Sequence, residues 1–153
     1  MYSIKDMKLE DIQLGIEAEN WEDAIRKAAV VPVERGMIKQ DYVEAMIRSV
    51  NEYGPYIVLS ENIALAHARP EDGAIETGLY FTTLAHPIEF GAEDFDPVKL
   101  LIVLSAKDGD GHIGLLCELS GILETEGVLE ALINAKTAEE FRGILVRTVN
   151  EIQ

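Results

Sequence analysis

The chain has 153 residues, 48% of them hydrophobic, and a formal net charge of −15 from 28 acidic and 13 basic side chains. This length and composition suit one domain over residues 1–153 with a buried core, and no apolar run approaches the ~20 residues that a transmembrane helix needs, so we expect no direct membrane insertion. The acidity opposes binding to nucleic acid or to anionic lipid, because both present negative phosphates.

The first third of the chain is predicted to form a strand and two helices. Apolar side chains two residues apart indicate a half-buried strand at Ile12, Leu14 and Ile16. Asn20 is suited to cap a first helix, with acidic residues in its first turn and apolar residues at helical spacing up to Val31. After a turn at Gly36, a second helix is indicated by the apolar spacing of Tyr42, Ala45, Met46 and Val50.

The middle of the chain is predicted to consist of extended segments. Strands are indicated at residues 56–59, 63–66 and 77–83. Pro87 begins a segment, 87–90, that we expect at a sheet edge, because proline cannot donate to a central ladder. Residues 98–105 are the most hydrophobic stretch, and we expect a central strand there that is covered on both faces.

Helices are predicted to follow at residues 111–122, 125–134 and 138–149. Asp110 is expected to cap the first of them, and Thr137 the last, with Glu140 at the capping-box position. Strands with helices at both ends of the chain indicate the α/β class. We expect a single layered domain with a mixed five-stranded sheet flanked by helices on both faces.

His67 is the most informative candidate for chemistry. It follows the apolar strand 63–66, and Arg69 and Pro70 come directly after it. An imidazole at the end of a rigid strand, with a cation beside it, suits chemistry on an anion. A single histidine at a strand end is more often structural, so both interpretations remain open at this point.

His112 is the second candidate. It follows the strand 98–105 and falls in the first turn of the next predicted helix, whose N-terminus attracts anions. If the strands 63–66 and 98–105 are parallel neighbours, His67 and His112 converge on one crevice; otherwise His112 is a polar helix-start residue that faces water. If the substrate is an anion, local positive charge must come from Arg69, Arg48 or a helix N-terminus, because the chain as a whole is acidic. We interpret His86 as a turn residue without a role.

The N-terminus and the cysteine count indicate a cytoplasmic protein. The first residues contain no apolar core of a signal peptide. Cys117 is the only cysteine, which rules out an internal disulfide and agrees with a reducing compartment. It lies in an apolar helical stretch, so we interpret it as core packing rather than as a reactive thiol.

Several motifs together resemble the enzyme IIA components of the bacterial sugar phosphotransferase system, of the fructose–mannitol type and its ascorbate-like branch. The resemblance covers nearly the whole chain. Its motifs are Trp21-Glu22-Asp23-Ala24, Tyr42-Val43-Glu44-Ala45-Met46, Gly54-Pro55-Tyr56, Ala64-Leu65-Ala66-His67-Ala68-Arg69-Pro70-Glu71 and Pro87-Ile88-Glu89-Phe90. The pairing of Gly-Pro-Tyr with His-Ala-Arg-Pro-Glu is far more specific than a lone histidine.

The resemblance implies a phosphoryl relay without a cofactor or a metal. Such a chain takes a phosphoryl group from the histidine-containing phosphocarrier protein and passes it to a cysteine of an enzyme IIB partner. Enzyme IIB then phosphorylates a sugar, here of the ascorbate type, as it crosses the membrane enzyme IIC. The resemblance leaves a homodimer open.

The site residues follow from the same resemblance. His67 takes the accepting position, and His112 matches the second active-site histidine of the family, with an orienting or stabilising role. Arg48 lies near a family arginine, and Arg69 is a further source of charge. Ala66 stands where many members have proline, which leaves the geometry of the strand end open.

Two alternatives from other classes remain. One is a metal-dependent hydrolase that uses His67, His112 and a carboxylate such as Glu71 or Asp110, although no short-spaced ligand pair supports it. The other is a phosphorylation-controlled sensor domain that regulates another protein.

Overall fold

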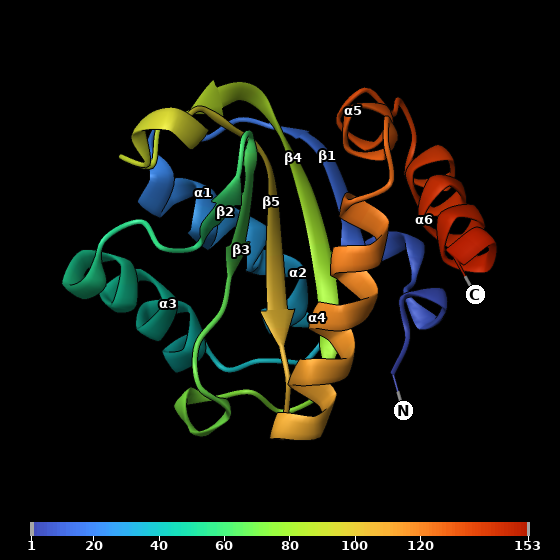
Figure 1. The fold of residues 1–153 in the computed structure, drawn as a ribbon. Coiled ribbons are helices and arrows are strands. Elements are labelled where there is room, and N and C mark those ends of the chain that lie inside the picture. The colour runs from blue at the N-terminus through green and yellow to red at the C-terminus, as the bar shows by residue number, and fades with distance from the viewer. Residues whose placement is uncertain (1, 153) are drawn as a thin grey trace.

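A five-stranded mixed sheet in the order β1-β4-β5-β3-β2 runs through the middle of the protein (Figure 1). The structure is a computed structural model, and it describes residues 2–152. The strands are β1 (Ile12–Ile16), β2 (Val58–Ser60), β3 (Ile63–Ala66), β4 (Gly78–Ile88) and β5 (Val98–Ser105). β3 and β5 are parallel neighbours, as are β1 and β4, whereas β4 pairs antiparallel with β5 and β2 with β3.

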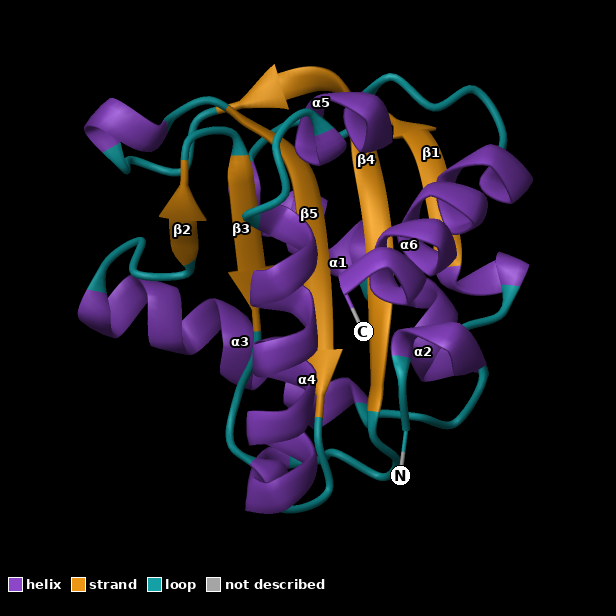
Figure 2. Cartoon of the chain, turned by 45° about the vertical axis from the view of Figure 1, so that its right-hand side comes forward, coloured by secondary structure: helices purple, strands orange, loops and turns teal. Residues whose placement is uncertain are grey.

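Helices cover both faces of the sheet (Figure 2). On one face lie α1 (Trp21–Ala28), α2 (Val30–Glu34) and α3 (Gln40–Tyr53), and on the other α4 (Gly109–Leu123), α5 (Val128–Ile133) and α6 (Ala138–Ile152). Short 3₁₀ turns are found at Ile4–Asp6, Leu9–Asp11, Pro70–Asp72 and Glu93–Phe95. The predicted α/β class, with a mixed five-stranded sheet between helical layers, is confirmed.

Alternation along β5 divides the core into two apolar layers. Leu101 and Val103 pack with residues of α1 and α3, whereas Leu100, Ile102 and Leu104 pack with residues of α4 and α6. This is the two-residue period of a strand that is buried on both faces, as its continuous apolar sequence predicted. The same period orients each side chain of β3, and so decides toward which helical layer His67 points.

The expected strand boundaries were partly wrong. The strand predicted at 56–59 lies at Val58–Ser60, and one strand, β4, continues from the predicted strand 77–83 as far as Ile88. The expectation of a sheet edge at 87–90 was wrong, because β4 lies between β1 and β5. The ladder between β4 and β5 shifts register between Thr83 and Ile88. Pro87 lies in this irregular stretch, where a regular ladder bond is already interrupted, so the strand tolerates it. His86 accordingly lies in β4 and not in a turn.

The helices also differ from expectation at their ends. The first helix ends at Ala28 and a separate helix, α2, contains Pro32, because proline lacks the N–H that a continuous helix would use. Asp108, and not Asp110, caps α4 by accepting a hydrogen bond from the Gly111 N–H at 2.7 Å. The Thr137 cap is confirmed, since its hydroxyl accepts from the Glu140 N–H at 3.0 Å.

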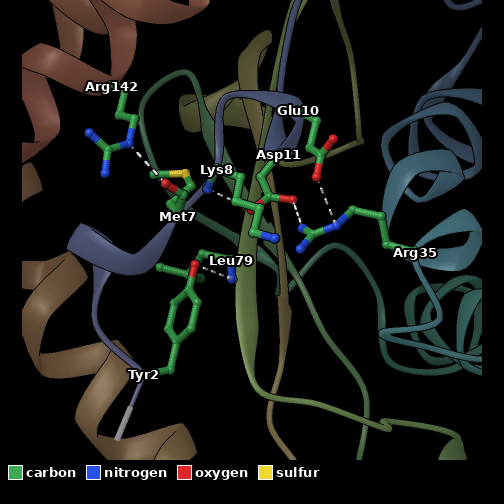
Figure 3. A network of polar contacts seen from close by, with 8 residues as sticks. All are labelled: Tyr2, Met7, Lys8, Glu10, Asp11, Arg35, Leu79 and Arg142. Atoms are coloured by element: carbon green, nitrogen blue, oxygen red, sulfur yellow. Dashed lines mark hydrogen bonds and ion pairs between the residues drawn. The ribbon is translucent and has the colours of Figure 1, made fainter.

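Polar contacts fasten the N-terminal segment to β4, α2 and α6 (Figure 3). The Arg142 guanidinium donates to the Met7 carbonyl at 2.8 Å, and Arg35 forms an ion pair with the buried carboxylate of Asp11. The Tyr2 hydroxyl accepts from the Leu79 N–H at 3.5 Å, and burial raises the pKa of Tyr2 to about 12. These contacts explain how a segment outside the sheet stays packed against it. Within residues 2–152, no helix combines the length and the apolar character required to cross a membrane.

Candidate active site

His67 and His112 lie together at one end of the sheet. β3 and β5 are parallel and paired up to Ala66 and Val103, so the C-terminal ends of both strands lie at the same end of the sheet. α4 then starts at Gly109 and carries His112 in its first turn. The centroids of the two imidazole rings are 6.1 Å apart. The convergence that was conditional on this strand pairing is therefore observed.

The period of the strand explains why the two rings meet. Ile63 and Leu65 pack into the layer of α4 and α6, whereas Ala64 and Ala66 pack into the layer of α1 and α3. His67 continues the odd-numbered series, so its side chain points to the side of α4. The Ala68 side chain points the opposite way, into the layer of α1 and α3.

One hydrogen bond fixes the chemistry of the His67 ring. Its Nδ1 lies 2.9 Å from the Leu65 carbonyl oxygen, which can only accept a hydrogen bond. Nδ1 therefore carries the proton in the neutral ring, and the lone pair of Nε2 stays free. The ring also makes an edge contact with Tyr56, at a centroid distance of 5.8 Å. His67 is thus set up as a nucleophile at Nε2.

His112 stays neutral more readily than a free histidine. Burial, and to a smaller extent the neighbouring His67, lowers the pKa of His112 below its ordinary value of 6.5. A neutral imidazole still offers one N–H donor. Its place in the first turn of α4 adds the positive end of the helix dipole, which favours an anion there.

A pocket of about 550 Å³ opens beside the two histidines. α3 contributes one wall, the loop after β3 contributes another, and α4 closes the end. Its lining residues are Arg48, Ser49, Glu52, Tyr53, Tyr56, His67, Ala68, Arg69, Pro70, Asp72, Gly109 and His112. All four residues expected at the site, the two histidines and the two arginines, therefore line one cavity.

The two arginines differ in what they already contact. The Arg69 side chain is 77% exposed and lies 3.5 Å from the Asp72 carboxylate and 3.7 Å from that of Glu71. No carboxylate lies within ion-pair distance of Arg48 among the residues that the structure describes. Arg48 is thus the less neutralised cation of the pocket.

Some features of the site were missed or misread from the sequence. Tyr53 and Tyr56 line the pocket, although residues 56–59 were interpreted only as a strand; the Gly54-Pro55 break that ends α3 was the signal that this segment turns toward the site. Cys117 is exposed and not core, because Leu115 and Leu119 take the inward face of α4 and position 117 lies between them. For the hydrolase alternative, no group of three metal-ligating side chains exists within residues 2–152.

Comparisons with known proteins all match the chain to enzyme IIA components of the sugar phosphotransferase system. Residues 7–147 match the family model described as "Phosphoenolpyruvate-dependent sugar phosphotransferase system, EIIA 2". The chain is 38% identical over 130 residues to the mannitol-specific cryptic phosphotransferase enzyme IIA component of Escherichia coli (strain K12), covering 85% of this chain and 88% of that one. It is 34% identical over 151 residues to the ascorbate-specific PTS system EIIA component of Shigella boydii, covering 93% and 97%.

A solved complex gives the structural counterpart. The complex of enzyme IIA and phosphorylated enzyme IIB of the Escherichia coli mannitol system contains a chain that superposes with a TM-score of 0.81 at 29% identity. The match covers 93% of this chain and 98% of the other. In that complex a chain of this fold is bound to a phosphorylated IIB protein.

Proposed function

We propose that this chain, which belongs to the EIIA type 2 family of the phosphoenolpyruvate-dependent sugar phosphotransferase system, carries its phosphoryl group on Nε2 of His67. As an enzyme IIA component it is a phosphotransferase of the relay and passes the group to an enzyme IIB partner. The observation that carries the choice of atom is the bond between Nδ1 and the Leu65 carbonyl, which leaves Nε2 as the free nitrogen beside the pocket.

The first transfer requires no general base. The donor is the phosphohistidine of the histidine-containing phosphocarrier protein; its N–P bond breaks while an Nε2–P bond forms, and the donor imidazole keeps the electron pair of the broken bond. Because Nε2 carries no proton, nothing has to be removed from the nucleophile. Catalysis then rests on in-line placement and on stabilising the phosphoryl oxygens.

Three groups of this chain supply that stabilisation. His112 donates from its ring N–H, the N-terminus of α4 contributes its dipole, and Arg48 contributes a cation that has no carboxylate of residues 2–152 within ion-pair distance. The dianionic group is held without a metal ion. Binding of the phosphoryl group by a few hydrogen bonds and charges suits a carrier, because the group must leave as readily as it arrives.

The second transfer reverses the first. The Nε2–P bond breaks and an S–P bond forms on a cysteine thiolate of enzyme IIB, while Nε2 recovers its lone pair. Through enzyme IIB the group reaches the sugar that passes the membrane enzyme IIC. We place this relay in the cytoplasm, on the membrane face from which enzyme IIB receives the group.

Both partners dock on the same face in turn. Exposed apolar side chains lie around the pocket, with Tyr53 71% exposed, Tyr56 46% and Ile113, next to His112, 62%. Such residues are favoured at interface centres, and a modest patch suits contacts that must separate quickly. We assign this face to both the phosphocarrier protein and enzyme IIB, because each must reach Nε2 of His67.

The identity of the sugar is inferred from the similar proteins and not from the pocket of this chain. An enzyme IIA component does not touch the sugar, so the partner IIB decides it. We propose an ascorbate-type sugar, since the ascorbate-specific relative matches along 97% of its length; the mannitol-specific relative is the competing candidate.

In vitro phosphotransfer tests the proposal. The chain is incubated with labelled phosphoenolpyruvate, enzyme I and the phosphocarrier protein, and the labelled atom is identified by ³¹P and ¹⁵N NMR. IIB proteins of the ascorbate and mannitol systems are then added in parallel. We expect phosphohistidine at Nε2 of His67 and faster transfer to the ascorbate-type IIB; label on any other residue overturns the site, and faster transfer to the mannitol-type IIB overturns the sugar.

A further inference from the structure

Tyr42 lies on the inner side of α3 and its hydroxyl joins two strands. The side chain is fully buried. The Ala68 N–H donates to the hydroxyl oxygen at 3.0 Å, and the hydroxyl donates to the Leu104 carbonyl at 2.8 Å. The Ala68 carbonyl oxygen, at 3.2 Å, is a second acceptor. One side chain of α3 therefore holds the residue after His67 and the end of β5.

The position of this hydroxyl follows from the ladder. The Leu65 N–H donates to the Ile57 carbonyl at 2.8 Å, on the β2 side, so the even-numbered N–H groups of this strand point toward β5. Ala66 pairs with Val103. In a parallel ladder the next bond would run from the Ala68 N–H to the Leu104 carbonyl. These are the two groups that the Tyr42 hydroxyl bridges.

The inserted hydroxyl separates the two strands where the site begins. Up to Ala66 and Val103, the backbones of β3 and β5 are hydrogen-bonded directly to each other. At Ala68 the hydroxyl oxygen of Tyr42 lies between the two backbones. Because β5 leads into α4, the same bridge influences the distance between His67 and His112. It also holds α3, which carries Arg48, against the strand that carries His67.

Resting on the proposed role of His67, we propose that Tyr42 is a positioning residue for phosphoryl transfer: its hydroxyl fixes the backbone on the far side of His67 and so keeps Nδ1 bonded to Leu65 and Nε2 open to the pocket. His67 lies between a ladder pair at Ala66 and this bridge at Ala68. Its backbone is thus held on both sides. The ring can then keep one tautomer without any hydrogen bond to Nε2.

The chemistry of the tyrosine suits this role. Burial raises the pKa of Tyr42 to about 12, so the hydroxyl keeps its proton at physiological pH and can donate and accept at once. Phenylalanine would fill the same volume but would leave the Ala68 N–H and the Leu104 carbonyl without the bridge. Those two groups then either stay unpaired or close directly on each other, and both outcomes release or shift the backbone at His67.

The chain offers a matched control in Tyr80. It is also buried, at 2% exposed, but among residues 2–152 its hydroxyl has no backbone partner, and the side chain that interacts with it is that of Ser105. Tyr42→Phe and Tyr80→Phe therefore each remove one hydroxyl from a buried side chain. Only the first removes a bridge next to His67.

The test measures the His67 ring and the transfer rate in both variants. Long-range ¹H–¹⁵N NMR should show one Nδ1–H tautomer in wild type and in Tyr80→Phe, and a mixture of tautomers in Tyr42→Phe. Labelling from the phosphocarrier protein should slow by about 10- to 100-fold in Tyr42→Phe only, as expected for a nucleophile that is slightly misplaced. A Tyr42→Phe variant that matches Tyr80→Phe in tautomer and rate overturns the inference.

Two further measurements separate the ways in which the experiment can fail. If wild type takes no label although its His67 shows the Nδ1–H tautomer, the proposed function fails, and the tautomers of Tyr42→Phe and Tyr80→Phe alone decide whether Tyr42 positions the ring. If Tyr42→Phe does not fold, hydrogen exchange in wild type decides: the Ala68 amide should be protected like the amides of β3, although it lies beyond the last strand residue. Exchange as fast as in an open loop rejects the bridge.

Discussion

The rings of His67 and His112 lie with their centroids 6.1 Å apart and their planes inclined by 53°. His67 reaches this place from the end of β3, and His112 from the first turn of α4. The rings are too far apart and too inclined to stack on each other. They are close enough that a group bonded to His67 can accept a hydrogen bond from His112. This geometry is consistent with the proposed division of tasks, in which one ring holds the group and the other stabilises it.

The first prediction is that His67 is the sole acceptor. His67→Ala should take no label from phosphoenolpyruvate, enzyme I and the phosphocarrier protein, because within residues 2–152 the His67 ring alone lines the pocket with its Nδ1 bonded to a carbonyl and its Nε2 free. His86→Ala is the control, since that histidine is exposed on β4 and does not line the pocket. Undiminished label in His67→Ala would falsify the assignment.

The second prediction is that His112 stabilises transfer and does not accept the group. His112→Ala should still be labelled at His67, but should pass the group to enzyme IIB more slowly, by about 10- to 1000-fold, as for the loss of one transition-state donor. Single-turnover transfer from the isolated phosphoprotein measures this step. A rate equal to that of wild type removes His112 from the site.

Much of this site could be predicted from the sequence, because its strands carry strong local signals. The apolar runs 63–66 and 98–105 have few alternatives to buried strands, and both lie where they were expected. The side of the sheet toward which the His67 side chain points follows from the two-residue period of the strand alone. The helix that begins before His112 was also expected, although its cap is Asp108 and not Asp110.

The remaining features depend on contacts between distant parts of the chain. The parallel pairing of β3 with β5 could only be assumed, since no local pattern specifies a neighbour. The apolar spacing of the predicted helix indicates that Tyr42 is buried. It does not indicate that the Tyr42 hydroxyl bonds to Ala68 and Leu104, which are distant in the sequence. Cys117 was misread because α4 is apolar on more than one face, so hydrophobicity alone did not show which side is inward.

The third prediction concerns pH. Burial and the neighbouring His67 lower the pKa of His112 below 6.5 in the folded chain. As the pH falls, the unfolded chain binds this proton first, so the stability that neutral His112 contributes is present above pH 6.5 and is lost as the pH falls through the folded-state pKa. NMR titration should show the lowered pKa. It should rise only part of the way in His67→Ala, because burial, the larger cause, remains.

Phosphorylation should move the same pKa in the opposite direction. A dianionic group on His67 favours the charged form of a nearby imidazole. The pKa of His112 should therefore be higher in the phosphorylated chain than in the free chain, by the same NMR titration. A value that does not change on phosphorylation contradicts a contact between His112 and the phosphoryl oxygens.

The fourth prediction separates the two arginines. Arg48→Gln should slow transfer to enzyme IIB by about 10- to 100-fold, because it removes a pocket cation that makes no ion pair within residues 2–152 and can stabilise the developing charge. Arg69→Gln should slow it by no more than a few-fold, since its exposed side chain already lies near Glu71 and Asp72 and such surface pairs contribute ~1 kcal/mol or less. Melting temperatures of both variants show whether the fold is intact. The reverse order of rates would make Arg69 the main contact.

The fifth prediction concerns the docking face. Ile113 is 62% exposed beside His112, so Ile113→Glu should leave the fold intact and place a charge at the centre of the surface that both partners must cover. Phe95→Glu is the matched control: Phe95 is 41% exposed but precedes β5, at the end of the sheet opposite to His67. We expect Ile113→Glu to raise the KM for both the phosphocarrier protein and enzyme IIB by about tenfold or more, as for the loss of a central apolar contact, while kcat changes little. Equal KM values in the two variants show that docking does not use this part of α4. A change for one partner alone shows that the two partners do not share the face.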